Sequence, residues 1–403
     1  MRIRARIVLR TALLISMTVS LAALSTPIKT DTGSCGGVTT LPFTDVMSSP
    51  FFCQIAEAYF SALTNGTTAT TYSPGDPVLR EQMAAFVTRT MDQSLKRGST
   101  RAALKQFWTP TSADGIGLTA IGTDSRLVES DGADLWVANG GGTVSRVRAS
   151  DGKLLETWTG ATGAFGVLSA KGLIFVTGFA NPTGRLYQID PRQTAGDVTP
   201  LPISLGGASR GIAFDGARVW TASDFPGSVS IVTLNPLSVT TVTTGFNHPF
   251  GLLYDGANIW VTDDGTGSGD TLKKLDANGN ILQTVTVGSQ PRFPVFDGTN
   301  IWVPNVSSNT VTVVRASTGA NLATLSNNGL DGPFAAAFDG ERILITNNGG
   351  DFPDTGPVSL WNAAGLTPLG SVSLGATTLP RGVCSDGHHF WVVLQGTNKL
   401  ARF

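Results

Sequence analysis

The feature that most constrains this fold is a short segment that recurs seven times after Gly115. It is clearest at residues 254–261 (YDGANIWV) and 296–303 (FDGTNIWV). The central apolar residues of the copies are Trp136, Phe175, Trp220, Trp260, Trp302, Leu344 and Trp391. Self-similarity at a period of about 40 residues is typical of repeat architectures.

Each unit contains enough β-prone sequence for four short strands. In one unit these runs are 251–254, 259–262, 271–275 and 281–287. The Asp-Gly pair between the first two runs favours a tight turn, because glycine tolerates a positive φ. Seven units of four antiparallel strands predict a mainly β protein, with a seven-bladed β-propeller at residues 115–403. The tryptophans then belong to the packing between blades.

The last unit ends at Phe403 after only three strands. Residues 116–122 (IGLTAIG), just before the first unit, resemble the fourth strand of other units, such as 282–288 (LQTVTVG). We therefore expect residues 116–122 to complete the last blade and close the ring, since an open ring would expose a sheet edge.

Residues 1–25 have the pattern of a signal peptide. Four arginines precede an apolar run at 11–24, and Ala23-Leu24-Ser25 suits a cleavage site. The pattern predicts an exported protein, extracellular or on the cell-envelope surface, with no transmembrane anchor after signal removal. Loss of the four arginines changes 28 basic and 29 acidic residues to 24 and 29, a net charge near −5 that argues against nucleic acid as a partner.

Residues 26–98 have the apolar spacing of helices and not the β-prone runs of the repeats. Phe52, Ile55, Tyr59 and Leu63 share one face of a predicted helix. Asp76 and Pro77 mark the start of a second helix, whose apolar face contains Met83, Phe86, Val87 and Met91. Residues 99–114 form a predicted linker to the propeller.

The helical domain resembles the S-layer homology motif. The resemblance rests on Phe43-Thr44-Asp45-Val46, the loop Tyr72-Ser73-Pro74 and the helix start at 80–89 (REQMAAFVTR). It implies binding to cell-wall or envelope polysaccharide through Arg80. One copy is visible where the family usually has three, and Leu79 replaces the expected threonine. The alternative is a small helical cap that binds nothing.

Residues 115–403 resemble the secreted NHL-like and YVTN-like propellers, the group that includes streptogramin lyases and lactonase-type propellers. The resemblance covers the seven repeats and implies the propeller fold. Those relatives include enzymes, binding modules and scaffolds, so it does not assign an activity.

One repeat position should form a ring at a mouth of the central channel, because it precedes the innermost strand of every blade. The residues at this position, five before each Asp-Gly aspartate, are Arg126, Phe165, Arg210, Phe250, Arg292, Phe334 and Arg381. No carboxylate occupies the position, so an anionic ligand or cation–π contacts must offset the repulsion between the arginines. We expect either a ligand site for an acidic sugar, carboxylate or phosphate, or stacked side chains that fill the channel.

A second ring follows the second strands and consists of Asn139, Asp224, Asp263, Asn305, Asn347 and Gln395. Such side chains commonly cap their own turns. Asp263, Asp264 and Asp270 offer a weak calcium site, which lacks the alternating carboxylates of a recognised calcium loop. We otherwise expect no cofactor and no metal.

Three cysteines allow one disulfide in an exported protein. Cys35 and Cys53 lie close in the sequence and are the predicted pair, whereas Cys384 lies in an apolar run and is expected to be a buried thiol.

The sequence therefore predicts an exported, envelope-associated protein whose propeller binds a ligand or protein partner, with an anionic glycan as the ligand class considered. One alternative is an enzyme of the lyase or lactonase type. The chain has only His248, His388 and His389, and no two are placed to share a metal, although His248 with Glu129 would be a conceivable acid–base pair. A second alternative is a surface scaffold without a small ligand.

Overall fold

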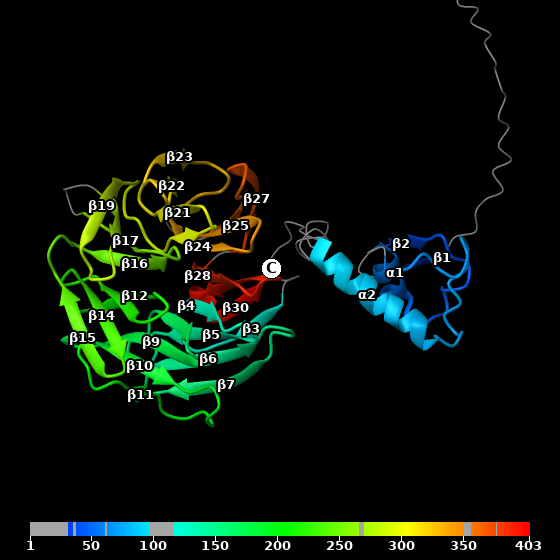
Figure 1. The fold of residues 1–403 in the computed structure, drawn as a ribbon, viewed down its shortest axis with the longest axis horizontal. Helices are drawn as coiled ribbons and strands as arrows, with labels where there is room; N and C mark the ends of the chain where they lie inside the picture. The colour runs from blue at the N-terminus through cyan, green and yellow to red at the C-terminus, as the bar shows by residue number, and fades with distance from the viewer. Residues whose placement is uncertain are drawn as a thin grey trace, which may run out of the picture. The chain divides into compact units, whose positions relative to one another are not determined.

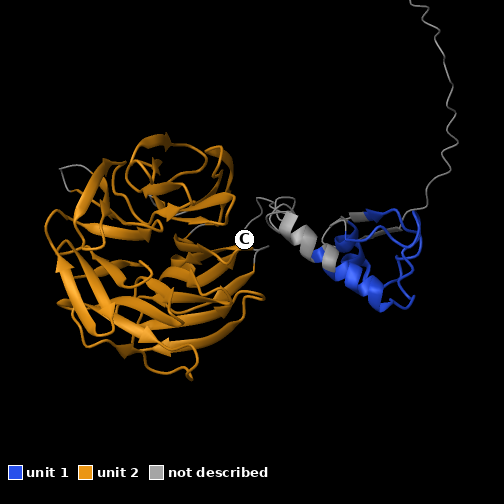
Figure 2. Ribbon diagram, in the orientation of Figure 1, with its two compact units in different colours: residues 1–103 blue, residues 104–403 orange. Residues whose placement is uncertain are grey.

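The computed structural model describes residues 31–34, 38–60, 63–96, 117–265, 270–349, 356–375 and 377–403. The chain divides into two compact units, residues 1–103 and 104–403 (Figure 2). The predicted signal peptide and the predicted linker at 99–114 lie outside the described residues. Within the described residues, no helix is both long enough and apolar enough to cross a membrane.

The first unit contains one two-stranded sheet and two helices. Its elements are β1 (Asp31–Ser34), β2 (Val38–Leu41), α1 (Phe52–Phe60) and α2 (Arg80–Lys96), and β1 pairs antiparallel with β2. Phe43 is fully buried and packs edge-on against Tyr59 at 5.3 Å between ring centroids. The Asp45 carboxylate accepts hydrogen bonds from the backbone N–H groups of Tyr72, at 2.9 Å, and Ser73, at 2.7 Å. Residues 43–46 thus tie α1 to the loop before α2.

The apolar face predicted for the second helix is only partly covered. Met83 and Val87 in α2 are 52% and 61% exposed, and Leu79 just before the helix is 56% exposed. The buried core of this unit instead gathers around β2 and α1. The amphipathic pattern correctly marked a helix at this position, but not a buried face.

The second unit consists of seven four-stranded antiparallel sheets, the blades, arranged around a central axis (Figure 1). Blade 1 contains β4 (Ser125–Ser130), β5 (Asp134–Asn139), β6 (Thr143–Arg148) and β7 (Leu154–Thr159). Blade 2 contains β8 (Val167–Ala170), β9 (Leu173–Ala180), β10 (Thr183–Ile189) and β11 (Thr199–Pro200). Blade 3 contains β12 (Ser209–Phe214), β13 (Val219–Ser223), β14 (Ser228–Leu234) and β15 (Leu237–Val242). Blade 4 contains β16 (Pro249–Tyr254), β17 (Ile259–Asp263), β18 (Thr271–Leu275) and β19 (Ile281–Thr286).

The remaining blades follow the same order from the axis outward. Blade 5 contains β20 (Val295–Phe296), β21 (Asn300–Asn305), β22 (Thr310–Arg315) and β23 (Asn321–Leu325). Blade 6 contains β24 (Pro333–Phe338), β25 (Arg342–Asn347), β26 (Pro357–Asn362) and β27 (Thr367–Ser373). Blade 7 contains β28 (Pro380–Ser385), β29 (Phe390–Leu394), β30 (Lys399–Arg402) and β3 (Leu118–Ala120). The 3₁₀ turn η2 (Gln395–Thr397) connects β29 and β30.

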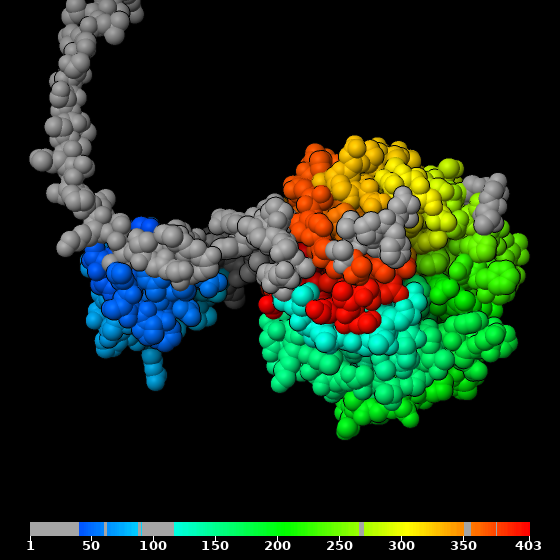
Figure 3. All heavy atoms as spheres, turned by 180° about the vertical axis from the view of Figure 1, so that it is seen from behind, coloured from blue at the N-terminus to red at the C-terminus, as the bar shows by residue number. Residues whose placement is uncertain are grey.

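Strand β3 closes the ring. It pairs antiparallel with β30, so that Leu118 lies opposite Ala401 and Thr119 opposite Leu400. Figure 3 shows the first described residues of the propeller, in cyan, against the C-terminal strand, in red. The predicted completion of the last blade by residues 116–122 is confirmed for Leu118–Ala120.

The recurring Asp-Gly-x-x-x-Trp segment is a single hydrogen-bonded unit. In blade 4, Asp255 accepts hydrogen bonds from the backbone of Ala257 and Asn258 through one oxygen, and from Trp260 Nε1 at 2.7 Å through the other. Gly256 has φ +95°. The indole bond recurs at 2.7–2.8 Å for Trp136, Trp220, Trp302 and Trp391. All five tryptophans are fully buried, which confirms their role in packing.

Blade 6 has an equivalent hydrogen-bonded turn built from different residues. Leu344 occupies the tryptophan position, and Arg342 donates from Nε to the Asp339 carboxylate at 2.8 Å. Both side chains of this ion pair are almost completely buried. The guanidinium thus occupies the second oxygen that the indole satisfies elsewhere, which prevents a buried unpaired carboxylate oxygen.

Candidate functional site

All seven residues of the predicted ring lie at, or shortly before, the start of the innermost strand of their blade. Five lie at the start of an innermost strand: Arg126 in β4, Arg210 in β12, Phe250 in β16, Phe334 in β24 and Arg381 in β28. Phe165 and Arg292 come shortly before β8 and β20. We call Arg126, Arg210, Arg292 and Arg381 the arginine ring.

Glycines let neighbouring blades approach closely at this ring. A Cβ at Gly211 would lie 2.4 Å from the carbonyl oxygen of Phe250, and a Cβ at Gly251 would lie 2.4 Å from that of Arg292. Real Cβ atoms do not come so close to backbone oxygens, so any larger residue would push the blades apart. The residue after the ring position therefore sets the width of the channel mouth.

Threonines of the second strands fix the backbone of three arginines. Thr177, Thr262 and Thr346 donate from Oγ1 to the carbonyl oxygens of Arg210, Arg292 and Arg381, at 3.1, 2.8 and 2.6 Å respectively. Each of these threonines belongs to the preceding blade, which contributes a phenylalanine to the ring. The alternation of arginine and phenylalanine is thus tied to contacts between blades.

Four phenylalanines pack together inside the channel. We call Phe165, Phe250, Phe293 and Phe334 the phenylalanine cluster; their ring centroids are 5.2–6.4 Å apart in five contacting pairs, and all four side chains are at most 9% exposed. Phe293 was not among the predicted ring residues. The available signal was a large residue directly after Arg292, at a position where four other blades have glycine.

Phe293 enters the cluster because its backbone leaves its own sheet. Phe293 N–H donates to the carbonyl of Phe334 at 3.1 Å, and its carbonyl accepts from Ala336 N–H at 3.2 Å. It therefore forms an isolated parallel bridge with Ala335 of blade 6. This departure shortens β20 to two residues and directs a fourth ring into the channel.

The arginines stack on the phenylalanine cluster. The guanidinium carbon of Arg292 lies 4.3 Å from the Phe250 ring centroid, and that of Arg381 lies 4.5 Å from Phe334. Arg210 and Arg126 lie 4.8 and 5.4 Å from the Phe165 ring. These distances are within the range of cation–π attraction.

Three of the arginines also form ion pairs, which corrects the expectation of a ring without carboxylates. The distances are 2.6 Å for Arg126 with Asp124, 3.5 Å for Arg210 with Asp224 and 3.2 Å for Arg292 with Asp264. Asp224 and Asp264 were considered for the second ring and for calcium, and Asp124 was not considered. Their pairing with the arginines was missed because they lie outside the arginines' repeat position. Asp264, for example, follows the second strand of blade 4, whereas Arg292 belongs to blade 5.

Arg381 differs from the other three arginines. Its Nε donates at 2.7 Å to the side-chain oxygen of Gln395, whose amide in turn donates to Asp124. Within the described part of the chain, no carboxylate lies at ion-pair distance from Arg381. Burial, and secondly the positive charge of Arg126, lower the pKa of Arg381 to about 10, so that the side chain remains a cation at neutral pH.

The number of blades explains why two arginines are adjacent. Two residue types cannot alternate completely around seven positions, and the repetition falls between Arg381 of blade 7 and Arg126 of blade 1. Arg210 is under-satisfied as well, because its buried Nε lacks a hydrogen-bond partner and burial lowers its pKa. Two like charges therefore meet at the seam closed by β3, and a third under-satisfied arginine lies in blade 3.

The second predicted ring has two kinds of member. Asn139, Asn305 and Asn347 are fully buried and donate to hydroxyls on the third strand of their own blade, namely those of Ser145, Thr312 and Ser359. Asp224 and Gln395 instead contact the arginine ring. The three asparagines are structural, whereas Asp224 and Gln395 belong to the candidate site.

The weak calcium prediction concerns three aspartates with other contacts. Asp263 is 1% exposed and forms an ion pair with Lys273. Asp264 pairs with Arg292, and Asp270 accepts from the backbone of Gln290. A cation at Asp263 would have to displace the lysine ammonium. The described residues contain no cluster of three metal-ligating side chains, and calcium stays an untested prediction.

His248 directly precedes β16 in blade 4, whereas His388 and His389 are adjacent at a turn of blade 7. His248 Nδ1 is 3.2 Å from the Asp224 carboxylate, and its ring stacks on Phe225 at 6.4 Å between centroids. His389 Nδ1 is 3.5 Å from Asp386 at the turn before β29. The conceivable partner of His248, Glu129, lies in a separate cavity of the channel.

The other predicted site residues belong to the first unit or to blade 7. Arg80 is exposed at the first position of α2. Cys53 in α1 is disulfide-bonded, and Cys35, its predicted partner, lies outside the described residues, so the pairing stays a prediction. Cys384 is a free, buried thiol, as expected, and burial raises its pKa well above the usual value.

Comparison with solved structures agrees with the architecture. A chain titled "Kuenenia stuttgartiensis Hydrazine Synthase" is 16% identical, with 70% of this chain and 95% of that chain covered at a TM-score of 0.59. The WD40 β-propeller domain of Doa1 is 16% identical, with 71% and 94% covered at 0.59. The computationally designed Ika8 protein is 15% identical, with 69% and 83% covered at 0.52. At such identities the likeness concerns the fold alone.

No protein-family model and no curated relative matches the sequence. The strand order, the closure by β3 and the structural neighbours agree on one architecture. The C-terminal unit of this chain is a seven-bladed β-propeller.

Proposed function

We propose that the propeller is a binding module that recognises an anionic group at the channel mouth formed by the arginine ring. The observation that carries this proposal is the charge imbalance at that mouth, where four arginines meet three paired aspartates among the described residues. The ligand class is a carboxylate-bearing molecule, with an acidic glycan as the specific candidate.

Arg381 is the residue best suited to bind the anion. It is bonded to a neutral amide, and the positive charge of Arg126 adds to the cost of its burial. An anion placed between Arg381 and Arg126 would give Arg381 a charged partner and would reduce the repulsion between the two guanidinium groups. Charge-assisted hydrogen bonds to a guanidinium contribute roughly 1.5–3 kcal/mol each, and the planar fork of arginine suits a carboxylate.

The alternative is that the arginine ring is structural. Two observations support this alternative. The arginines stack on the phenylalanine cluster, and three of them form ion pairs, so most of their interactions need no ligand. The two functions differ in what an acidic ligand does. An acidic ligand does not stabilise a structural ring, whereas it stabilises a binding site increasingly as its concentration exceeds the Kd.

The test is an array of uronic-acid and sialic-acid glycans with their neutral counterparts, probed with the full chain and with the double variant Arg210→Ala, Arg381→Ala. We expect preferential binding of acidic glycans, weaker binding at high salt, and loss of that preference in the double variant. Arg148→Ala is the control, because it removes an exposed arginine paired with Asp151. Equal binding of acidic and neutral glycans, or a double variant that folds and binds like the parent, would refute the proposal.

We also propose that the protein is exported and associates with the cell envelope through its first unit. The pattern of residues 1–25 and the S-layer homology resemblance support this, and the exposure of Arg80 leaves its guanidinium accessible. The test is co-sedimentation of the full chain with purified envelope polysaccharide. Arg80→Ala should reduce co-sedimentation without changing the melting temperature of the propeller.

The enzymatic and scaffold alternatives have separate tests. A lyase or lactonase would need an acid–base pair, and His248 already bonds to Asp224 beside Arg210. His248 would therefore be the first residue to replace. The enzymatic alternative would be favoured if the protein turned over a lactone or an acidic glycan and His248→Asn abolished this turnover. A protein that binds none of the acidic glycans would favour the scaffold.

A further inference from the structure

A cavity lies along the channel, and none of the four arginines of the arginine ring lines it. Its volume is about 250 Å³, below the ~300–1,000 Å³ range that drug-sized ligands occupy. Residues from all seven innermost strands line it, including Val128, Val167, Ile212 and Leu252, together with Phe293. The Phe293 ring belongs to the phenylalanine cluster, so this cluster forms part of the cavity wall.

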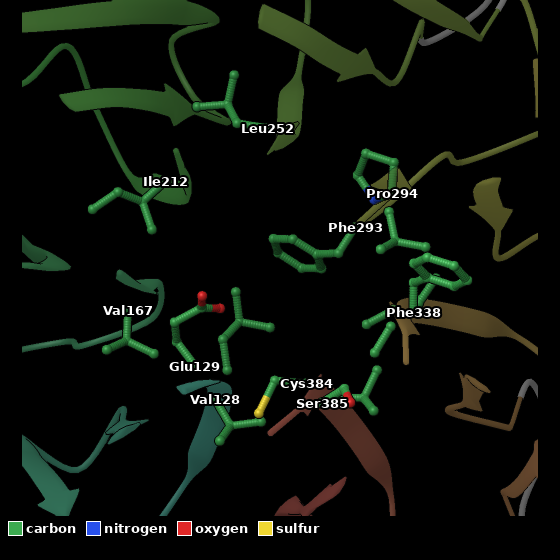
Figure 4. Close-up of a pocket in the computed structure, with 16 residues that line it drawn as sticks. Val128, Glu129, Val167, Ile212, Leu252, Phe293, Pro294, Phe338, Cys384 and Ser385 are labelled. Atoms are coloured by element: carbon green, nitrogen blue, oxygen red, sulfur yellow. The ribbon is translucent and has the colours of Figure 1, made fainter. Parts of the chain in front are cut away.

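Glu129 is the one acidic residue among those that line this cavity. Figure 4 shows its carboxylate directed into the cavity, surrounded by apolar side chains. Cys384 is the other titratable group on the wall. Burial raises the pKa of its thiol, which therefore stays protonated. No hydrogen bond or ion pair joins the Glu129 carboxylate to another described residue.

Glu129 is half-buried, and an unpaired carboxylate among apolar side chains needs an explanation, because polar groups withdrawn from water are normally hydrogen-bonded. Nothing in the strand requires it here. The equivalent positions in blades 2, 3, 4 and 7 are Leu168, Ala213, Leu253 and Cys384, all apolar or weakly polar. An apolar residue would fit the strand equally well, so the charged form of Glu129 costs stability. Water in the cavity offsets part of this cost, and a bound cation would offset more of it.

We propose that this cavity binds a small organic cation, a primary ammonium with a short apolar chain, through the carboxylate of Glu129. The ammonium would donate to the carboxylate, and its alkyl chain would contact the valine, leucine and isoleucine side chains of the wall. The rings of Phe293 and Phe338, which also line the cavity, would add cation–π attraction. This site is independent of the anion site proposed at the arginine ring.

The pH dependence of binding follows from the surroundings of Glu129. Burial raises the pKa of its carboxyl from 4.5 to about 7. Below that value the carboxyl is neutral and attracts an ammonium weakly, and above it the carboxylate is charged. Affinity for an ammonium should therefore rise with pH through about 7, and binding near that pH should release protons.

The test is calorimetric titration of the full chain with n-butylammonium, with n-butanol as the neutral control. At about pH 8 we expect n-butylammonium to bind roughly ten- to a hundredfold more tightly than n-butanol, the range of one charge-assisted hydrogen bond. Glu129→Gln should remove this preference and leave n-butanol binding unchanged. Glu129→Asp, which keeps the charge on a shorter side chain, should retain part of it.

Three results would overturn the proposal. They are equal affinity of the parent for n-butylammonium and n-butanol, unchanged n-butylammonium affinity in folded Glu129→Gln, and no heat of binding for n-butylammonium at any pH between about 6 and 9. Circular dichroism of each variant establishes that it is folded.

Discussion

Replacing Glu129 by glutamine should stabilise the propeller at about pH 8 and leave its stability unchanged at about pH 4. The carboxyl is surrounded by apolar side chains, and this raises its pKa from 4.5 to about 7. The folded state therefore holds this proton more tightly than the unfolded state. Stability falls as pH rises from about 4.5 to about 7, and above that range the native protein bears the cost of a charge in apolar surroundings.

The size of the effect follows from the pKa. A tenfold change in proton affinity corresponds to about 1.4 kcal/mol, so the rise from 4.5 to about 7 corresponds to about 3 kcal/mol. The carboxylate faces a cavity that has room for water, and water lowers the cost of a charge. We therefore expect Glu129→Gln to raise the free energy of unfolding by ~1–3 kcal/mol at about pH 8.

Urea unfolding followed by tryptophan fluorescence measures this effect, because all the described tryptophans lie in the propeller. Parent and variant are compared at the same pH, so other titrations cancel. Glu156→Gln is the matched control, because the Glu156 carboxylate pairs with Arg146 at 3.3 Å. Loss of this ion pair should be neutral or slightly destabilising at about pH 8. A variant that is no more stable than the parent at about pH 8, or equally stabilised at about pH 4, would refute the reasoning.

Three further predictions concern the closure, the channel mouth and the repeated turn. Deleting residues 116–122 removes β3 and should lower the melting temperature by on the order of 10 °C, whereas deleting the first unit should leave the propeller transition in place; equal losses would exclude closure by β3. Gly211→Ala should destabilise the propeller by ~2 kcal/mol or more, because its Cβ would clash with a backbone oxygen at 2.4 Å; Gly196→Ala, whose Cβ would meet nothing within 4 Å, is the control in the same urea experiment. Asp255→Ala should cost about 1–3 kcal/mol more than Asp276→Ala, because both aspartates accept backbone hydrogen bonds but only Asp255 accepts from a buried indole; equal losses would show that the indole bond is dispensable.

Much of the propeller could be predicted because its information is local and repeated. In blade 4 the predicted run at 271–275 coincides with β18, and the other three runs match β16, β17 and β19 within two residues at each end. The last blade could be completed from the sequence because three strands leave one edge unpaired, and only residues 116–122 matched the missing fourth strand. The arginine ring followed from one repeat position, since equivalent residues of successive blades face the same axis.

The partners of that ring could not be predicted in the same way. Asp264 pairs with Arg292 across blades, and Gln395 bridges Arg381 to Asp124 across the closing seam. These contacts depend on how loops bend and how adjacent blades rotate, which no single repeat encodes. Phe293 illustrates the same limit, because it pairs with the neighbouring blade and not with its own.

The sequence by itself determined the number of blades, the buried tryptophans and the seven residues that share the ring position, because each depends on a period that can be counted. The tertiary structure decided which charges are balanced and where space remains. Arg381 lies beside Arg126 because seven is odd, so an alternating ring must place two like residues together. Glu129 lies in a cavity because the innermost strands of several blades converge on the axis around it, and only their joint packing determines whether that space is filled.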